Sequence, residues 1–290
     1  MDNKVPELRD SLSEVPFRIS MCFKDIQLAI GTAFTYLYQG QLYLVTNWHN
    51  VTGREPSTLK LKSGEAAIPD RLRIEIPVMV GTATTKSLGP ETICLEWRET
   101  EFLLYEDTGE YPTKPVWYEH PQHGHEIDVV VAPIGVPEGI SVCPANDSKL
   151  NLSAVLLRPS LDVFILGFPR GMSGGAKFPV WKRGSIASEP EIDVDNLPKI
   201  LIDTATREGM SGSPVYLCQI GYFQSEEKYD EGGYQRCLGE GRRFLGVYSG
   251  RIGDDNFQAQ LGIVWKASVI EEIIQAAQVG RSSFELSCTS

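Results

Sequence analysis

The sequence predicts an all-β protein of sandwich or barrel type that ends in one α-helix. The 290 residues fall largely into short apolar runs, rich in β-branched and aromatic residues and separated by Gly, Pro, Asn and Asp. Helical periodicity is scarce, and the one amphipathic helical stretch lies near the C-terminus. Repeated strands with turn residues between them are typical of a β-sandwich or β-barrel.

Six runs are expected to form strands, with turns between them. They comprise residues 27–38, 41–46, 71–79, 128–134, 162–168 and 244–248. Gln39-Gly40, between the first two runs, predicts a hairpin. The intervals 81–115 and 225–233 are expected to hold surface insertions.

The predicted helix spans residues 268–278. Its apolar residues recur on one face at helical spacing: Val269, Ile270, Ile273, Ile274 and Ala277. Ser268 followed by Glu271 is typical of a capping box, and Gly280 is the expected stop.

Composition excludes several classes of protein. Hydrophobic residues make up 42% of the chain, enough for a full core, yet no run of about 18 apolar residues predicts a transmembrane helix. A net charge of −11 argues against nucleic-acid binding, which needs a basic face. The N-terminus is polar, without the apolar segment of a secretory signal, so we expect a cytoplasmic location and no contact with a membrane.

The six cysteines are Cys22, Cys94, Cys143, Cys218, Cys237 and Cys288. They form no CxxC pair and follow no regular spacing, so reduced thiols are expected rather than a disulfide framework. Cys218 and Cys237 flank a loop and are the pair that a hairpin could bring together.

A short glycine-rich run around Ser211, Glu208-Gly209-Met210-Ser211-Gly212-Ser213, carries the clearest chemical signal. A serine becomes a nucleophile only when a base takes its proton and fixed donors hold the oxyanion that forms. The glycines let the backbone turn tightly and let a substrate carbonyl approach the amides.

The chain offers a base and an acid upstream of this serine. His49 lies in Thr46-Asn47-Trp48-His49, and Asp128 opens the apolar run Val129-Val130-Val131. Glu119 and Glu126 compete for the role of the acid, but either could be a solvated loop charge. We favour Asp128, because an acid at the start of an apolar strand needs a specific reason to be there. The intervals are similar, 79 residues from His49 to Asp128 and 83 from Asp128 to Ser211, which indicates two halves around a cleft.

Together these segments resemble the trypsin-like serine peptidases of chymotrypsin fold, in which the triad follows the order His, Asp, Ser. The resemblance runs from about residue 28 to the C-terminal helix and is closest to the bacterial stand-alone and HtrA/Deg-like branch, without its PDZ domain. It implies two six-stranded-type antiparallel β-barrels and a C-terminal α-helix. We expect an N-terminal barrel over residues 15–150 with His49 and Asp128, and a C-terminal barrel over 151–280 with Ser211 and the substrate pocket.

The resemblance also implies the roles of single residues. His49, Asp128 and Ser211 would form the triad, with Asp128 fixing the imidazole. The N–H groups of Gly209 and Ser211 would form the oxyanion hole. The residues expected to bind substrate are Ala205, Ser249, Gly250, Arg251 and Gly262, of which Ser249 would also support Asp128.

Specificity and activation follow from the same resemblance. Ala205 at the base of the pocket and Gly262 on its wall carry no charge, so we expect a small or medium apolar residue before the cleaved bond. Met210 stands where secreted trypsins keep the aspartate that captures a new N-terminus, so we expect activity without pro-peptide cleavage.

The predicted function is that of a serine endopeptidase acting on protein or peptide substrates, with a dedicated co-encoded target implied only by the stand-alone relatives. A silent peptide-binding module and an esterase-type acyl hydrolase remain as alternatives. The oligomeric state stays open. His120, His123 and His125 invite a metal site, but H-x-x-H-x-H fits no zinc pattern, and we expect no metal and no cofactor.

Overall fold

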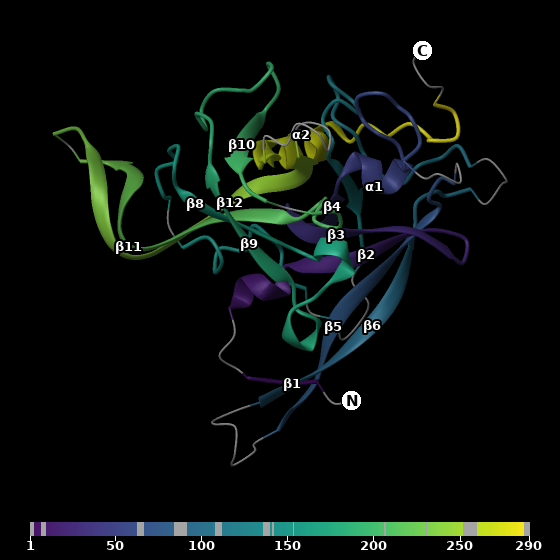
Figure 1. Cartoon of the computed structure of the whole chain (residues 1–290), viewed down its shortest axis with the longest axis horizontal. Helices are drawn as coiled ribbons and strands as arrows, with labels where there is room; N and C mark the ends of the chain where they lie inside the picture. Colours follow the sequence, from purple (N-terminus) through teal and green to yellow (C-terminus); the bar gives the residue numbers. More distant parts are fainter. Residues whose placement is uncertain are drawn as a thin grey trace.

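The computed structural model describes residues 3–6, 10–62, 67–83, 92–107, 112–135, 140, 142–152, 154–205, 207–229, 231–251 and 260–286. Two antiparallel β units lie side by side, with a short helix on one and a longer helix on the other (Figure 1). The predicted class is confirmed, since the described chain is mostly β, with an antiparallel sheet of six strands plus β1, a closed six-stranded antiparallel barrel and a C-terminal helix. Within the described chain, no helix combines the length and apolar character needed to cross a membrane.

The first unit is a sheet of order β1-β6-β5-β2-β3-β4-β7, in which β1 extends the six strands of the predicted barrel. Its strands are β1 (Asn3–Pro6), β2 (Pro16–Phe23), β3 (Ile26–Tyr38), β4 (Gln41–Thr46), β5 (Arg71–Ala83), β6 (Thr92–Leu103) and β7 (Val130–Pro133). A 3₁₀ turn, η1 (Ser11–Glu14), precedes β2, and the helix α1 (Trp48–Thr52) follows β4.

The second unit is a closed six-stranded barrel of order β10-β13-β12-β11-β8-β9. Its strands are β8 (Asp162–Gly167), β9 (Val180–Ile186), β10 (Lys199–Asp203), β11 (Pro214–Lys228), β12 (Tyr234–Arg251) and β13 (Leu261–Lys266). The 3₁₀ turns η2 (Pro169–Gly171) and η3 (Gly175–Lys177) lie between β8 and β9, and α2 (Ser268–Ala276) follows β13.

The β3–β4 hairpin forms where it is predicted. Gln39 and Gly40 adopt φ values of 48° and 81°, the left-handed pair that a two-residue hairpin turn requires. The strand predicted over residues 128–134 is shorter, since β7 begins at Val130 and leaves Asp128 in the segment before it.

The C-terminal helix begins at Ser268 as predicted, but the predicted capping box and stop are wrong. Ser268 makes no side-chain cap, and Glu271 instead accepts a hydrogen bond from the Tyr36 hydroxyl at 2.7 Å. Ala277, rather than Gly280, takes the left-handed conformation that ends the helix, with φ 47°. The helix is held by its apolar face, because Val269, Ile270, Ile273 and Ile274 are all buried.

One hydrophobic cluster joins the two units. It contains Phe34 and Val45 of the first sheet, Tyr216 and Trp265 of the barrel, and the apolar face of α2. Two further clusters fill the interior of each unit separately. The shared cluster therefore fixes the two units against each other across the cleft described below.

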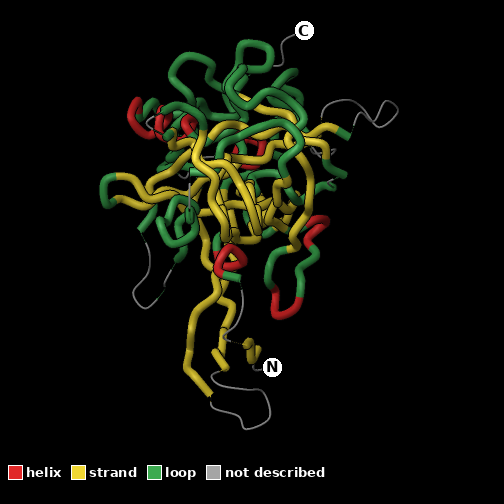
Figure 2. Tube along the Cα trace, turned by 90° about the vertical axis from the view of Figure 1, so that its left-hand side faces the viewer, coloured by secondary structure: helices red, strands yellow, loops and turns green. Residues whose placement is uncertain are grey.

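Two long hairpins extend from this body. The β5–β6 hairpin, paired with β1, points away from the rest of the molecule, as two views show (Figure 1, Figure 2). The β11–β12 hairpin curves outward from the barrel (Figure 1). They occupy the two intervals where insertions are predicted, of which residues 84–91, 108–111 and 230 lie outside the described residues.

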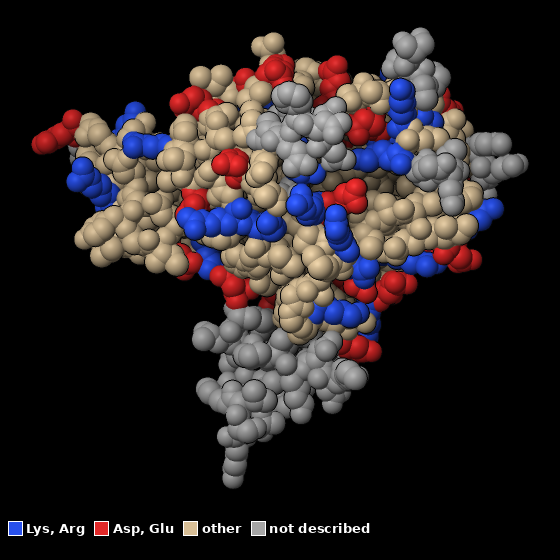
Figure 3. Space-filling model, in the orientation of Figure 1, with Lys and Arg blue, Asp and Glu red and all other residues tan. Residues whose placement is uncertain are grey.

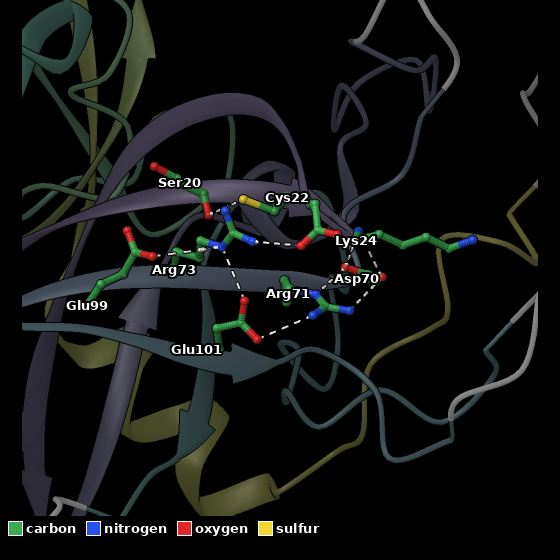
Figure 4. Close-up of polar contacts among 9 residues, drawn as sticks. Ser20, Cys22, Lys24, Asp70, Arg71, Arg73, Glu99 and Glu101 are labelled. Carbon is green, nitrogen blue, oxygen red and sulfur yellow. Dashed lines mark hydrogen bonds and ion pairs between the residues drawn. The ribbon is translucent and has the colours of Figure 1, made fainter.

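A network of ion pairs anchors the base of the β5–β6 hairpin (Figure 4). The Arg71 guanidinium contacts Asp70 at 2.9 Å and Glu101 at 3.3 Å, and Arg73 contacts Glu101 at 3.2 Å. Asp70 also accepts the backbone N–H of Lys24 in the β2–β3 turn, at 3.0 Å. Each such exposed pair contributes at most about 1 kcal/mol, so the network orients the turn more than it stabilises the fold.

The four described cysteines, Cys22, Cys143, Cys218 and Cys237, are free thiols. Cys218 lies opposite Arg242 in the β11–β12 ladder and Cys237 opposite Phe223, so the two cysteines that a hairpin could have joined do not face each other. Burial raises the pKa of the Cys143 thiol to about 11 and that of Cys218 to about 12. Both thiols are therefore protonated at neutral pH.

Candidate active site

The short helix α1 holds His49 against the body of the protein. Asn47, in extended conformation, turns the chain out of β4, and all five residues of α1 are buried. Gly53 ends the helix with φ 67° and donates its N–H to the carbonyl of His49 at 3.0 Å. A side chain at Gly53 would place its Cβ 2.8 Å from Cδ of Pro69, so glycine is required on both counts. His49 therefore has little freedom to move.

Asp128 fixes the orientation of the His49 imidazole. Its carboxylate is 4% exposed and accepts the His49 Nδ1–H at 2.7 Å, the His49 backbone N–H at 2.9 Å and the Ser249 hydroxyl at 2.5 Å. The Asn47 side chain fixes the Asp128 carbonyl at 2.6 Å. An ionised carboxylate only accepts hydrogen bonds, so Nδ1 carries the proton and Nε2 is left with a lone pair.

The Ser211 loop is fastened to the first sheet. The Ser211 carbonyl accepts the backbone N–H of Thr32 at 2.9 Å and the Asn50 amide at 3.2 Å, while the Thr32 hydroxyl donates to the Gly209 carbonyl at 2.9 Å. Gly209 and Gly212 adopt φ values of 89° and 85°, which favour glycine. The loop is thus held between the two units by contacts on its far side from solvent.

Two backbone N–H groups of this loop, those of Gly209 and Ser211, have no protein partner among the described residues. The Glu208 carbonyl accepts the N–H of Arg170 at 2.6 Å, and in a trans peptide the N–H points opposite to the carbonyl. The Gly209 N–H is thereby turned away from Arg170. Within the described chain, neither it nor the Ser211 N–H donates to another protein group. The pair is available to a negatively charged oxygen.

A cleft of about 900 Å³ brings most of the predicted site residues together. The predicted residues that line it are His49, Asp128, Ser211, Ser249, Gly250 and Arg251. His123 and His125 also line it. Acidic and basic side chains are interspersed over the face of the molecule drawn in Figure 3.

The other predicted pocket residues lie differently. Ala205 is exposed just beyond the end of β10, while Gly262 is buried in β13 and does not line the cleft. A Cβ on Gly262 would lie 2.6 Å from the ring of Tyr248, which fills the space beside it. Tyr248 is 1% exposed, yet it borders the cleft. Sequence reasoning missed this residue, since it reads as one more aromatic residue of a strand.

Glu119 is not a solvated loop charge. Its carboxylate is 5% exposed, and one oxygen accepts the indole N–H of Trp48 at 3.0 Å, that of Trp117 at 3.0 Å and the backbone N–H of Arg281 at 3.1 Å. Trp48 directly precedes His49. Glu119 therefore ties the histidine helix to a segment that follows α2.

That segment, residues 278–286, lies across the end of α1. The Arg54 guanidinium is 6% exposed and donates to the Ser283 carbonyl at 2.8 Å and its hydroxyl at 2.9 Å. The Ser283 hydroxyl in turn donates to the Thr52 carbonyl at 2.7 Å. Gly280 passes so close to Trp117 that a Cβ would lie 2.3 Å from the indole nitrogen. Glycine at 280 thus serves close packing and not the end of a helix.

The rings of His120 and His123 lie side by side with centroids 5.2 Å apart, while the His125 ring lies against Trp48. His120 is buried, and its Nδ1 accepts the backbone N–H groups of Gln122 and His123 at 3.3 and 3.2 Å. Its Nε2–H therefore donates to Glu272 at 3.1 Å. Among the described residues, no three His, Cys, Asp or Glu side chains are grouped so as to hold a metal ion.

Comparison with known proteins gives one family match. The trypsin-like peptidase domain matches residues 31–221, about two thirds of the chain. No curated protein matches the sequence significantly.

Several solved structures align weakly. The HtrA-type protease AlgW with a tripeptide aligns over 91% of this chain and 60% of its own, with 13% identity and a TM-score of 0.48. A serine endoprotease from Yersinia pestis aligns over 93% of this chain and 67% of its own, with 12% identity and a TM-score of 0.47. The inactive form of the Rv3671c protease from M. tuberculosis aligns over 92% of this chain and 90% of its own, with 16% identity and a TM-score of 0.41. The chain thus spans about three fifths of the length of AlgW. At these identities and TM-scores, the alignments indicate neither a substrate nor a branch of the family.

Proposed function

We propose that this chain, which belongs to the trypsin-like peptidase family, is a serine endopeptidase that uses Ser211, His49 and Asp128 as its catalytic triad. The observation that carries this proposal is the buried Asp128 carboxylate. It receives the His49 Nδ1–H and the Ser249 hydroxyl, beside a cleft that Ser211 also lines.

The tautomer of His49 determines its role. With Nδ1–H committed to Asp128, the lone pair of Nε2 is free to take the proton of the Ser211 hydroxyl as the oxygen attacks a substrate carbonyl. The imidazolium that forms is stabilised by Asp128, which stays ionised. His49 then returns the proton to the leaving amine, and water releases the acyl group from Ser211 by the same steps.

The oxyanion would be held by the N–H groups of Gly209 and Ser211. Their freedom from protein partners within the described residues supports this role, as does the Arg170 N–H that orients the Glu208–Gly209 peptide. A donor fixed in advance costs no reorganisation when the charge forms, and one such donor is worth about 10²–10³ in rate.

The end of β12 is suited to an extended substrate. Ser249, Gly250 and Arg251 line the cleft, and a peptide could add to this strand by main-chain hydrogen bonds. Tyr248, packed beneath Gly262, limits the depth available to a side chain next to the cleaved bond. This supports the preference for a small or medium apolar residue at that position, and cleavage products that consistently end in Lys or Arg would contradict it.

The test is labelling with a fluorophosphonate, followed by intact-mass measurement, on the wild type and Ser211→Ala. One adduct on the wild type and none on the variant is the expected result. A folded wild type that takes no adduct would favour a silent peptide-binding module. Turnover of esters but of no peptide would favour an esterase.

Location and targets are further proposals. The four free thiols support a reducing compartment, and a cytoplasmic location remains the prediction from the cysteine pattern. A dedicated protein target is best sought with Ser211→Ala as a trap, since the variant keeps the cleft but cannot form the acyl-enzyme.

A further inference from the structure

The outer part of the β11–β12 hairpin is a two-stranded ribbon, and its β11 edge is covered at residues 224–226. Residues 154–156 run along β11, where the Leu156 N–H donates to the Gln224 carbonyl at 2.8 Å and the Glu226 N–H to the Ala154 carbonyl at 2.8 Å. The face of the ribbon toward this segment is packed, and Phe223 there is 7% exposed.

The edge of β12 is open by contrast. β13 pairs with β12 only from Gly246 to Arg251. From Tyr234 to Arg243, no segment among the described residues pairs with the outer edge of β12. Soluble proteins normally cover, shorten or charge such edges, because unpaired N–H and carbonyl groups recruit another strand.

The opposite face of the ribbon carries three strongly exposed apolar side chains between Arg236 and Gln224 on one side and Glu240 on the other. Ile220, Tyr222 and Leu238 are 85%, 77% and 70% exposed, and Tyr222 lies directly opposite Leu238 in the ladder. Strand alternation places all three on one face, and the surface over the curved ribbon at the left of Figure 3 carries few charges along its lower side. A two-stranded ribbon is marginally stable by itself, so this one gains from a partner.

We propose that the partner is a second copy of this chain, joined antiparallel along the β12 edges with the two-fold axis at Leu238. The charges favour this register, since Arg236 and Glu240 stand two residues on either side of Leu238. Each Arg236 then faces the Glu240 of the other copy, in two equivalent pairs. Tyr222 and Leu238 of both copies form one continuous apolar row across four strands.

The two neighbouring registers lack these ion pairs. With the axis at Cys237, Arg236 faces Leu238 and Glu240 faces Tyr234. Moving the axis one residue, to Gly239, sets Arg236 of one copy opposite Arg242 of the other, like charges directly across a ladder. A two-fold contact between the β12 edges uses that edge once in each copy, so this association closes as a dimer.

Charge reversal tests the register. Arg236→Glu alone and Glu240→Arg alone each place like charges opposite one another twice, and each is expected to be monomeric. Mixing these two variants restores both pairs, so the mixture is expected to form a heterodimer. Glu227→Arg, an exposed change near the tip and away from the proposed pairs, serves as the matched control and is expected to remain dimeric.

The measurement is sedimentation velocity at about 0.1 mM, a concentration that populates even a weak dimer. It is made on full chains that also carry Ser211→Ala, which prevents self-cleavage. Circular dichroism confirms that each variant folds. If the protein without charge reversals stays monomeric, the proposal is overturned, and a different protein becomes the candidate partner of this face. The proposed register is overturned if Arg236→Glu and Glu240→Arg each still form a dimer, or if the two variants form no heterodimer when they are mixed.

Discussion

Replacing Gly209 by alanine is expected to remove most of the activity while the protein stays folded. Gly209 has φ 89°, and a Cβ there would lie 2.3 Å from the Phe168 carbonyl and 2.9 Å from the Arg170 N–H nitrogen. Gly40, in the β3–β4 turn, provides a matched control. Its φ is 81°, but a Cβ there meets nothing within 4 Å.

The difference between the two sites sets the size of the effect. In both variants an L-residue occupies the left-handed region, at a cost of roughly 1–2 kcal/mol of stability. At Gly209 the contact with Phe168 must also open from 2.3 Å to 3.4 Å, a shift of 1.1 Å (3.4 − 2.3). That shift breaks the alignment of the Glu208–Gly209 peptide with Arg170 and moves the N–H out of the oxyanion hole. The loss of one donor predicts a fall of about 10²–10³ in kcat.

The assay compares kcat for one peptide substrate with thermal denaturation of the same samples. Both alanine variants are expected to lose similar amounts of stability to backbone strain, with any larger loss in Gly209→Ala arising from the clash. Only Gly209→Ala is expected to lose activity. If its kcat stays within about tenfold of the wild type, the Gly209 N–H does not hold the oxyanion and the reasoning is refuted.

Three further perturbations have distinct outcomes. Asp128→Asn is expected to lower kcat about 10⁴-fold, because an amide donating to His49 Nδ1 selects the wrong tautomer; a fall below about tenfold would count against the triad. Glu119→Ala leaves the buried indole N–H groups of Trp48 and Trp117 unpaired, at about 1–3 kcal/mol each, and removes the part-buried contact with the Arg281 N–H. Thermal denaturation should therefore show a far larger loss of stability than for the exposed control Glu126→Ala, and equal losses would be inconsistent with the buried role. Burial raises the pKa of Cys218 from 9.0 and that of Tyr105 from 10.0, both to about 12. Between about pH 9 and pH 12 the folded state therefore binds more protons than the unfolded state, and the free energy of unfolding falls as the pH rises. Urea denaturation across this range should show that fall, and a flat profile would contradict the assigned burial.

The sequence predicts well the elements whose signal is local. The runs that became β3 and β4 are rich in β-branched and aromatic residues, and Gln39-Gly40 supplies the turn between them. The length of the β11–β12 ribbon escapes such reasoning. Its outer residues include several Gly, Gln, Glu and Arg, which have little preference for strands, and it forms through pairing across the hairpin.

The candidate site divides in the same way. His49, Asp128 and Ser211 are predicted because each occurs in a characteristic local context, although their joint role remains our proposal. Glu119 and Tyr248 depend on neighbours outside their own segments: Arg281 is 162 residues from Glu119, and the Tyr248 ring lies against Gly262 of the next strand. A carboxylate and an aromatic ring have no local pattern that reveals such partners.

The contact between Ser283 and the end of α1 has a consequence for biosynthesis. Ser283 lies 231 residues after Thr52, whose carbonyl it binds, so the ribosome adds it about 10–50 s later at typical rates of translation. Until then the end of α1 lacks its contact with Ser283. The Glu119 carboxylate, which binds the Trp48 indole, likewise lacks the N–H of Arg281. The segment around His49 therefore gains its contacts with Arg281 and Ser283 only after the barrel strands and α2 have been synthesised.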